Sequence, residues 1–172
     1  MFIAVDGYNF IKQSPELRKL EQVELQKARE GLVERLAQYK RMKGHSITVV
    51  FDGAPEGRRA GHRERSRGIE VVFSKPGEKA DDVLKHLAEE KRAGVMIVTS
   101  DQAVAHFAEK KGATPLSASD FEEKMAMACL YDLKGGGAEI FTPDRPVAPS
   151  KKGPSHRLSK TEKRKLAARR KL

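Results

Sequence analysis

The sequence has a single cysteine, Cys129, among its 172 residues. One thiol can neither close a disulfide within the chain nor supply the paired cysteines of a zinc site. So little cysteine is typical of proteins from reducing compartments, and we expect a cytoplasmic location. Cys129 falls in a predicted helix, where we expect it to be buried as a small hydrophobic side chain.

Long hydrophobic runs are also missing from the sequence. No apolar stretch approaches the roughly 20 residues that a membrane-spanning helix needs, which excludes an integral membrane protein. The apolar stretch from Met1 to Val5 is short and leads directly into Asp6, so we do not expect a secretory signal. No membrane partner is expected.

Several common catalytic and cofactor-binding motifs are absent. There is no GxGxxG or Walker motif, so no nucleotide cofactor is expected. The five histidines form no HxH or HExxH pattern, and neither Ser74 nor Ser100 has an evident histidine partner. Aromatic residues make up only 6% of the chain, so stacking on nucleic-acid bases would depend on few side chains.

Positive charge is abundant but unevenly distributed. The formal net charge is +10, which points to a polyanionic partner. Residues 148–172 hold ten Lys or Arg and one acid, or +9, whereas the first 147 residues hold 24 bases and 23 acids, or +1. Because Gly and Pro are concentrated just before this tail, we predict one domain over residues 1–142, followed by a linker and basic tail over 143–172.

The basic tail has two interpretations. Either it binds RNA, through residues that include Lys151, Lys152, Arg164 and Arg169, or it is a solvated end that serves only solubility. If all nine net charges contacted phosphates of a single strand, the slope of log affinity against log salt would steepen by up to about 6. Deleting residues 148–172 should then flatten this slope, and an unchanged slope would exclude the tail as an RNA anchor.

Short apolar runs alternate with amphipathic stretches through the body of the chain. Runs typical of buried parallel strands occur at residues 2–5, 47–51, 69–73, 95–99 and 114–116. Helical patterns occur at residues 16–42, 81–92, 102–112 and 119–133. Strands separated by single helices predict an α/β fold with a mostly parallel sheet of about five strands, covered on both faces. In such sheets ligands bind at the carboxyl ends of the strands.

Acidic residues fall at those predicted carboxyl ends. They are Asp6, Asp52, Asp81, Asp82, Asp101 and Asp120. Taken singly, each is explained as a helix cap or a turn residue. A converging set is harder to explain, because two carboxylates about 4 Å apart repel by roughly 4 kcal/mol at an effective dielectric constant of 20. Oxygen ligands without Cys or His favour Mg²⁺ or Mn²⁺, which would hold phosphate oxygens and activate water.

Four short motifs follow one another in a consistent order. They are Ile3-Ala4-Val5-Asp6-Gly7-Tyr8-Asn9, Val50-Phe51-Asp52-Gly53, Val72-Phe73-Ser74 ahead of Ala80-Asp81-Asp82, and Val98-Thr99-Ser100-Asp101. Together they resemble the YacP-type NYN domain proteins of the PIN-like nuclease superfamily, over residues 1–142. The resemblance implies a PIN-like three-layer α/β/α fold. It also implies divalent-metal-dependent cleavage of single-stranded RNA, namely of mRNA on the translating ribosome.

The resemblance also implies roles for individual residues. The metal-binding and catalytic acids would be Asp6, Asp82 (or Asp81) and Asp101, with Asp120 or Glu123 as a weaker fourth. Asn9 would orient a metal ligand or a phosphate. Lys79 stands where the family commonly has a small hydroxyl residue, and a cation there would modify phosphate binding.

An arginine-rich stretch lies between two predicted strands. It holds Arg58, Arg59, Arg63, Arg65 and Arg67. Because Arg binds phosphate in bidentate fashion and stacks on bases, we predict a mobile loop that clamps single-stranded RNA, assisted by Lys75, Lys79 and Tyr8. The alternatives are a solvated loop and, for Tyr8, packing at the edge of the core.

Two functions remain open at this point, and a third is disfavoured. The first is a metal-dependent endoribonuclease that leaves 5′-phosphate and 3′-hydroxyl ends. The second is a ribosome- or RNA-binding module with a PIN-like fold and little or no catalysis. The third, a phosphotransfer receiver-like domain, would require a Lys after the fifth strand, where the sequence has Ser117, Ala118 and Ser119.

Overall fold

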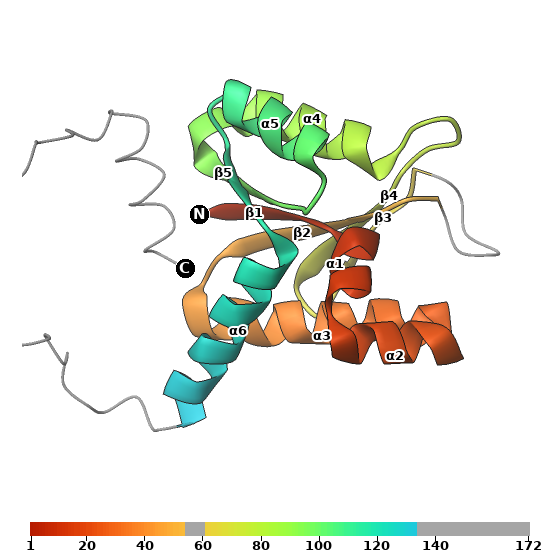
Figure 1. Ribbon diagram of the computed structural model, residues 1–172, viewed down its shortest axis with the longest axis vertical. Coiled ribbons are helices and arrows are strands. Elements are labelled where there is room, and N and C mark those ends of the chain that lie inside the picture. The colour runs from red at the N-terminus through yellow and green to blue at the C-terminus, as the bar shows by residue number, and fades with distance from the viewer. Residues whose placement is uncertain (54–60, 134–172) are drawn as a thin grey trace, which may run out of the picture.

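The computed structural model describes residues 1–53 and 61–133, which form a three-layer α/β/α arrangement around one sheet (Figure 1). The six strands lie in the order β3-β4-β2-β1-β5-β6. Five of them are parallel: β1 (Phe2–Asp6), β2 (Ser46–Phe51), β4 (Ile69–Phe73), β5 (Val95–Val98) and β6 (Thr114–Leu116). The edge strand β3 (Arg63–Ser66) is antiparallel to β4. The α/β fold with a mostly parallel sheet is confirmed.

Helices cover both faces of the sheet. One face carries α4 (Ala80–Lys91), which continues into the short 3-10 helix η1 (Arg92–Gly94), and α5 (Gln102–Lys110). The other carries α1 (Gly7–Gln13), α2 (Pro15–Val23), α3 (Leu25–Lys43) and α6 (Ala118–Leu133) (Figure 1). In the described part of the chain, no helix is long and apolar enough to cross a membrane.

Each face of the sheet has its own hydrophobic core. Ile3 and Val5 of β1 belong to the core beneath α1, α3 and α6, whereas Ala4 belongs to the core beneath α4 and α5. Side chains of a strand alternate between faces, and both faces are buried here. This is why the strands occur in the sequence as continuous apolar runs.

The single helix predicted over residues 16–42 is two helices. The backbone of Glu24 is extended, with φ −162°, and separates α2 from α3. A further helix, α1, precedes Pro15, which occupies the first position of α2, where its missing N–H costs nothing. Ser14 lies at the junction of α1 and α2. Arg35 of α3 donates hydrogen bonds to the Ser14 hydroxyl (3.2 Å) and to the carboxylate of Glu122 in α6 (2.9 Å). Arg35 therefore connects α3 to this junction and to α6.

Strand β3 occupies part of the stretch predicted to be a mobile arginine-rich loop. Arg67 and Gly68 both have positive φ, +50° and +83°, and join Ser66 to Ile69 in a two-residue turn. Turns with this backbone match the twist of paired strands, so they form tight hairpins. Arg63 and Arg65 therefore lie on a paired strand, and the loop prediction is wrong for them. Arg58, Arg59, the four tail residues singled out above and the predicted domain boundary lie outside the described residues.

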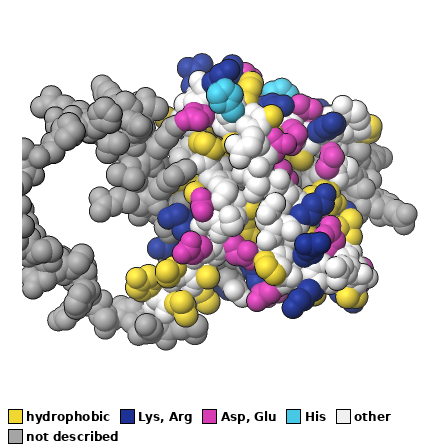
Figure 2. Space-filling view, in the orientation of Figure 1, with side chains coloured by type: hydrophobic (Ala, Val, Ile, Leu, Met, Phe, Trp, Pro, Cys, Tyr) yellow, Lys and Arg dark blue, Asp and Glu magenta, His cyan; other side chains and the backbone are white. Residues whose placement is uncertain are grey.

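Cys129 is exposed, so its predicted burial is wrong. Helix α6 turns Phe121, Met125 and Ala128 toward the core, at helical spacings of three and four residues. Cys129 falls on the outward side of this helix. Three apolar side chains on the same helix, Met127, Leu130 and Tyr131, are also exposed (Figure 2).

Candidate active site

Asp6 lies where β1 ends and α1 begins. Its Oδ1 accepts a hydrogen bond from the backbone N–H of Asn9 at 3.1 Å, so the carboxylate caps the helix. Its side chain is buried. The next residue, Gly7, starts the helix directly against the ring of Phe51, where a Cβ atom would overlap the ring. A glycine is therefore required for the helix to begin this close to β2.

Asp101 occupies the equivalent place after β5, the neighbouring strand. Its Oδ1 accepts hydrogen bonds from the N–H groups of Ala103 (2.7 Å) and Val104 (3.1 Å) and so caps α5. Strands β1 and β5 are parallel neighbours, with Val5 opposite Val98. Two capping aspartates are thereby placed at adjacent carboxyl ends, where the sequence predicts a site.

A buried threonine connects these two aspartates. The Thr99 hydroxyl donates to Oδ2 of Asp6 at 3.3 Å and accepts from the N–H of Asp101 at 3.1 Å. The residue types alone do not reveal this role, because threonine also fits a buried strand end. The signal that could have found it is its place between a buried strand and a capping aspartate.

Asn9 provides a second connection between the two strand ends. Its backbone N–H binds Asp6, and its side-chain Oδ1 accepts a hydrogen bond from the N–H of Ser100 at 3.0 Å. Asn9 therefore holds Asp6 and the segment before Asp101 in one arrangement. The structure places it as a positioning residue for the acids.

Two carboxyl groups at this edge, those of Asp6 and Asp81, have raised pKa values. Burial is the main cause that raises the pKa of Asp6 from an ordinary 3.8 to about 6, and repulsion from Asp81 and Asp101 adds to it. The hydrogen bonds from Asn9 and Thr99 act in the opposite direction. Burial and then repulsion from Asp101 also raise the pKa of Asp81. Within the described residues, no Lys or Arg forms an ion pair with any of the three acids.

The structure distinguishes between Asp81 and Asp82. Asp81 is the one whose charge affects Asp6. The carboxylate of Asp82 instead accepts from the backbone N–H of Lys79 at 3.2 Å, which closes the first turn of α4, and lies 3.9 Å from Lys85 Nζ. We therefore place Asp81 with Asp6 and Asp101 in a group that we call the acidic cluster, whereas Asp82 stabilises the start of the helix.

The remaining predicted acids do not join the acidic cluster. Asp120 and Glu123 are exposed on α6, where both line a hollow that also contains Lys43. Asp52, at the end of β2, accepts a hydrogen bond from the buried Ser74 hydroxyl at 2.9 Å. That hydroxyl in turn accepts from the N–H of Gly53 at 3.0 Å, so Ser74 ties the ends of β2 and β4 together.

Several predicted RNA-binding side chains have partners within the protein. The Tyr8 hydroxyl accepts hydrogen bonds from two nitrogens of Arg29, and its ring lies 5.2 Å from the ring of Phe51. This matches the alternative of packing at the edge of the core. Arg67 pairs with Glu34 of α3 at 3.1 Å. Lys75 and Lys79 are exposed near the carboxyl end of β4 and the start of α4.

The acidic cluster is compatible with Mg²⁺ or Mn²⁺. It offers only oxygen ligands, and a buried carboxylate with two acidic neighbours is a place that a cation would stabilise. As arranged, no three His, Cys, Asp or Glu side chains of the described residues are grouped closely enough to hold a metal together. Mg²⁺ usually takes one or two protein carboxylates and completes its shell with water and substrate phosphate. Asp6 and Asp101 are the two carboxylates that such a mode of binding would use.

Comparisons with known proteins agree with the fold. Residues 3–171 match the family model of the YacP-like NYN domain. A curated relative, the uncharacterized protein YacP of Bacillus subtilis (strain 168), is 34% identical over 91 residues. That match covers 51% of each chain, so the chain spans about half the length of the curated relative in this alignment.

Two solved structures share the architecture. The crystal structure of a mutant of Rae1 (YacP) from Bacillus subtilis matches with a TM-score of 0.65 and 24% identity, covering 86% of this chain and 87% of that one. The crystal structure of Rae1 (YacP) itself matches with a TM-score of 0.62 and 28% identity, covering 78% of each chain. The PIN-like fold is thus supported by sequence and by structure.

Proposed function

Because the chain belongs to the YacP-like NYN domain family, whose fold is nuclease-like, we propose that it is a divalent-metal-dependent endoribonuclease. The single observation that carries the proposal is the acidic cluster, in which Asp6, buried at the end of β1, has Asp101 after β5 and Asp81 of α4 as acidic neighbours that raise its pKa. The substrate we propose is single-stranded RNA, and specifically mRNA on the translating ribosome in the cytoplasm. The substrate and the ribosome follow from the family resemblance, not from contacts in this chain.

The residues of the site have distinct tasks in this proposal. Mg²⁺ or Mn²⁺, when bound, supplies positive charge to the phosphate and lowers the pKa of water. Asp6 and Asp101 hold the cation, and Asp81 adds negative charge beside them. Asn9 and Thr99 hold the two ligands in register. Water attacks phosphorus as the bond to the 3′ oxygen breaks, and the products carry 5′-phosphate and 3′-hydroxyl ends.

The test is cleavage of an end-labelled single-stranded RNA by the full chain with Mg²⁺, with Mn²⁺ and with EDTA. Asp101→Asn and Asp81→Asn should each reduce cleavage about a hundredfold or more, because each removes charge from the cation site. Asp82→Asn should retain most activity and most of its stability, because its amide oxygen can still accept the hydrogen bond of the Lys79 N–H at the start of α4.

Asp52→Asn is the matched control, since an amide oxygen can still accept the hydrogen bond of Ser74. Its cleavage rate should equal that of the wild type. Cleavage that is insensitive to EDTA, or equal losses in all four variants, would contradict the assignment of the acidic cluster.

A second candidate is an RNA-binding module with this fold and negligible catalysis. One observation favours it: the described residues group no three potential metal ligands together. It predicts that wild type and Asp101→Asn bind RNA equally well and that neither cleaves it. The same assay, read with a binding measurement, therefore separates the two candidates.

A further inference from the structure

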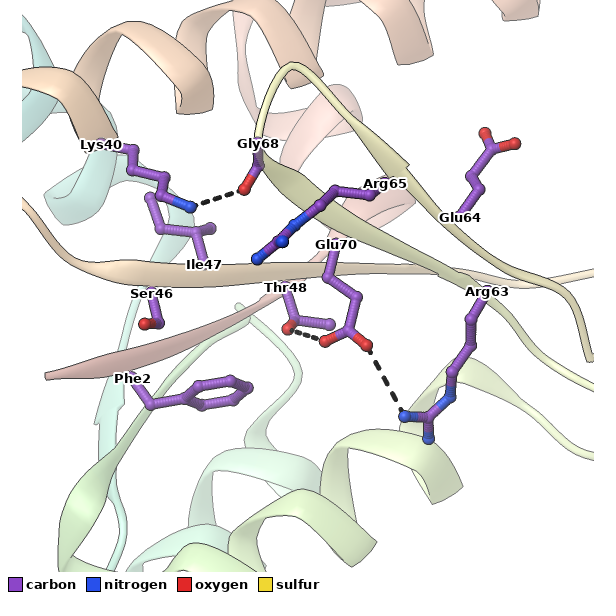
Figure 3. Close-up of a pocket in the computed structure, with 10 residues that line it drawn as sticks. All are labelled: Phe2, Lys40, Ser46, Ile47, Thr48, Arg63, Glu64, Arg65, Gly68 and Glu70. Atoms are coloured by element: carbon purple, nitrogen blue, oxygen red, sulfur yellow. Dashed lines mark hydrogen bonds and ion pairs between the residues drawn. The ribbon is translucent and has the colours of Figure 1, made fainter.

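A hollow lies beside the β3 edge of the sheet, away from the acidic cluster. Its volume is about 500 Å³, within the range of small-molecule sites (Figure 3). Phe2 begins β1 and Asp6 ends it, so four residues of extended strand, roughly 13 Å, separate the hollow from the cluster. Phe2, which lines the hollow, also packs in part against the core beneath α4 and α5.

The floor of the hollow is a fixed polar surface. Glu70 accepts a hydrogen bond from the Thr48 hydroxyl at 2.7 Å, and its other oxygen lies 3.7 Å from Arg63 Nη1. At one side Lys40 Nζ donates to the carbonyl of Gly68 at 2.6 Å. These contacts are drawn as dashed lines in Figure 3. Thr48 and Arg63 hold the Glu70 carboxylate in one position, where it can accept a further hydrogen bond from a ligand.

Positive charge is in excess around this floor. The charged lining residues are Lys40, Arg63 and Arg65 against Glu64 and Glu70, and Figure 3 shows Glu64 pointing away from the others. Two-thirds of the Arg63 side chain is exposed (66%), and Arg65 forms no ion pair with any described residue. Figure 3 shows the guanidinium groups of Arg63 and Arg65 extending in different directions, on either side of Glu70, so each is placed to contact a different phosphate of a nucleic-acid strand.

Phe2 adds an aromatic surface to the hollow. Its ring is partly exposed, and Lys91 Nζ lies 4.7 Å from the ring centroid. Charged side chains on an edge strand have an ordinary explanation, because they discourage pairing with other strands. That explanation covers only the two arginines, Arg63 and Arg65. It does not account for an aromatic ring and a hydrogen-bonded carboxylate lining the same open hollow.

We propose that this hollow binds one nucleotide of the RNA strand that reaches the acidic cluster. Arg63 and Arg65 hold the two phosphates that flank this nucleotide, its base lies against Phe2, and an amino group on the base donates to Glu70. The inference deepens the proposed function and rests on its choice of RNA as the ligand. It gives β3 the task of holding the strand, while the acidic cluster acts on it.

The test measures binding of fluorescein-labelled single-stranded RNA to the full chain by anisotropy, in EDTA, so that no cleavage interferes. Arg63→Glu with Arg65→Glu should weaken binding at least tenfold at about 50 mM salt and lower the salt slope by about 1.4. Phe2→Leu should weaken binding about fivefold or more and leave the salt slope unchanged. The RNA must be long enough to span both sites.

Matched controls come from the rest of the described chain. Arg18→Glu with Lys19→Glu makes the same charge change on exposed positions of α2. Phe107→Leu removes another partly exposed ring that carries a lysine, since Lys111 Nζ lies 5.2 Å from its centroid. Circular dichroism and melting curves establish that each variant folds.

Test variants that bind RNA no more weakly than their controls would overturn the inference, even if the wild type cleaves RNA. The converse result, hollow-dependent binding by a protein that does not cleave, would sustain the inference and overturn the proposed nuclease. Adenosine monophosphate is a further competitor. If it binds the hollow and RNA does not displace it, the site takes a free nucleotide and the inference is again overturned.

Discussion

Asp6→Asn is expected to stabilise the metal-free protein and to abolish RNA cleavage. Above pH 6 the ionised carboxylate disfavours the folded state by up to about 3 kcal/mol, since its pKa is raised from 3.8 to about 6. Asparagine removes the charge; its Oδ1 can still accept from the N–H of Asn9, and its Nδ2 can donate to the hydroxyl oxygen of Thr99 in place of the bond that Asp6 accepts. The melting temperature should rise by about 5–10 °C, whereas cleavage should fall a hundredfold or more.

The pH dependence of this effect has a definite sign. A carboxyl group whose folded pKa is raised stabilises the protein while it is protonated, and this contribution is lost as pH increases. The stability advantage of Asp6→Asn over the wild type should therefore be absent below about pH 4 and complete above about pH 6. Thermal melts in EDTA across this pH range measure it directly.

With Mg²⁺ present, the wild type should become more stable than Asp6→Asn. A cation that binds only the folded wild type adds stability according to its concentration and affinity, and Asp6→Asn should gain much less. Asp52→Asn, at the neighbouring strand end, should behave as the wild type in all of these melts. A metal-free Asp6→Asn protein that is less stable than the wild type at pH 7.5 would show that Asp6 is structural and not a strained ligand.

The sequence predicts most of the sheet because its strands are buried on both faces. Continuous apolar runs such as residues 47–51 and 69–73 have few alternatives, and the carboxyl ends of parallel strands must meet at one edge. Asp6 and Asp101 could be placed at one site for that reason alone.

What sequence patterns could not provide is the orientation of individual side chains. Both Asp81 and Asp82 lie in the first turn of α4, and their positions in the sequence do not show that Asp82 caps the helix while the charge of Asp81 acts on Asp6. Likewise β3 is short and polar, as edge strands often are. It has no alternation of apolar and polar residues by which a strand could be predicted from the sequence. Its one local signal is the Arg67–Gly68 turn.

The helix breaks were missed for a related reason. The break between α2 and α3 falls at Glu24, whose backbone is extended, and neither Gly nor Pro stands there to indicate it in the sequence. Helix α2 also buries only Leu17, so it has little apolar periodicity of its own. The helix α1 has only seven residues, too few for a periodic signal.

Gly7→Ala is expected to destabilise the fold by about 2–3 kcal/mol, the cost of an added methyl group in a packed core. The new Cβ would overlap the ring of Phe51. That ring cannot easily move, because it lies 5.2 Å from the ring of Tyr8 and 5.8 Å from that of Phe73. The overlap between the new Cβ and the ring can therefore be removed only if α1 shifts away from β2.

Such a shift would also affect the site, because α1 carries Asn9. Displacing Asn9 loosens its hydrogen bonds to Asp6 and to the segment before Asp101, so cleavage should fall more than the loss of folded protein explains. Urea denaturation measures the first effect, and cleavage rates at a temperature where the variant is fully folded measure the second. Gly94→Ala is the control, since nothing lies within 4 Å of its added Cβ. Equal stability of the two variants would mean that α1 does not need to approach β2 so closely.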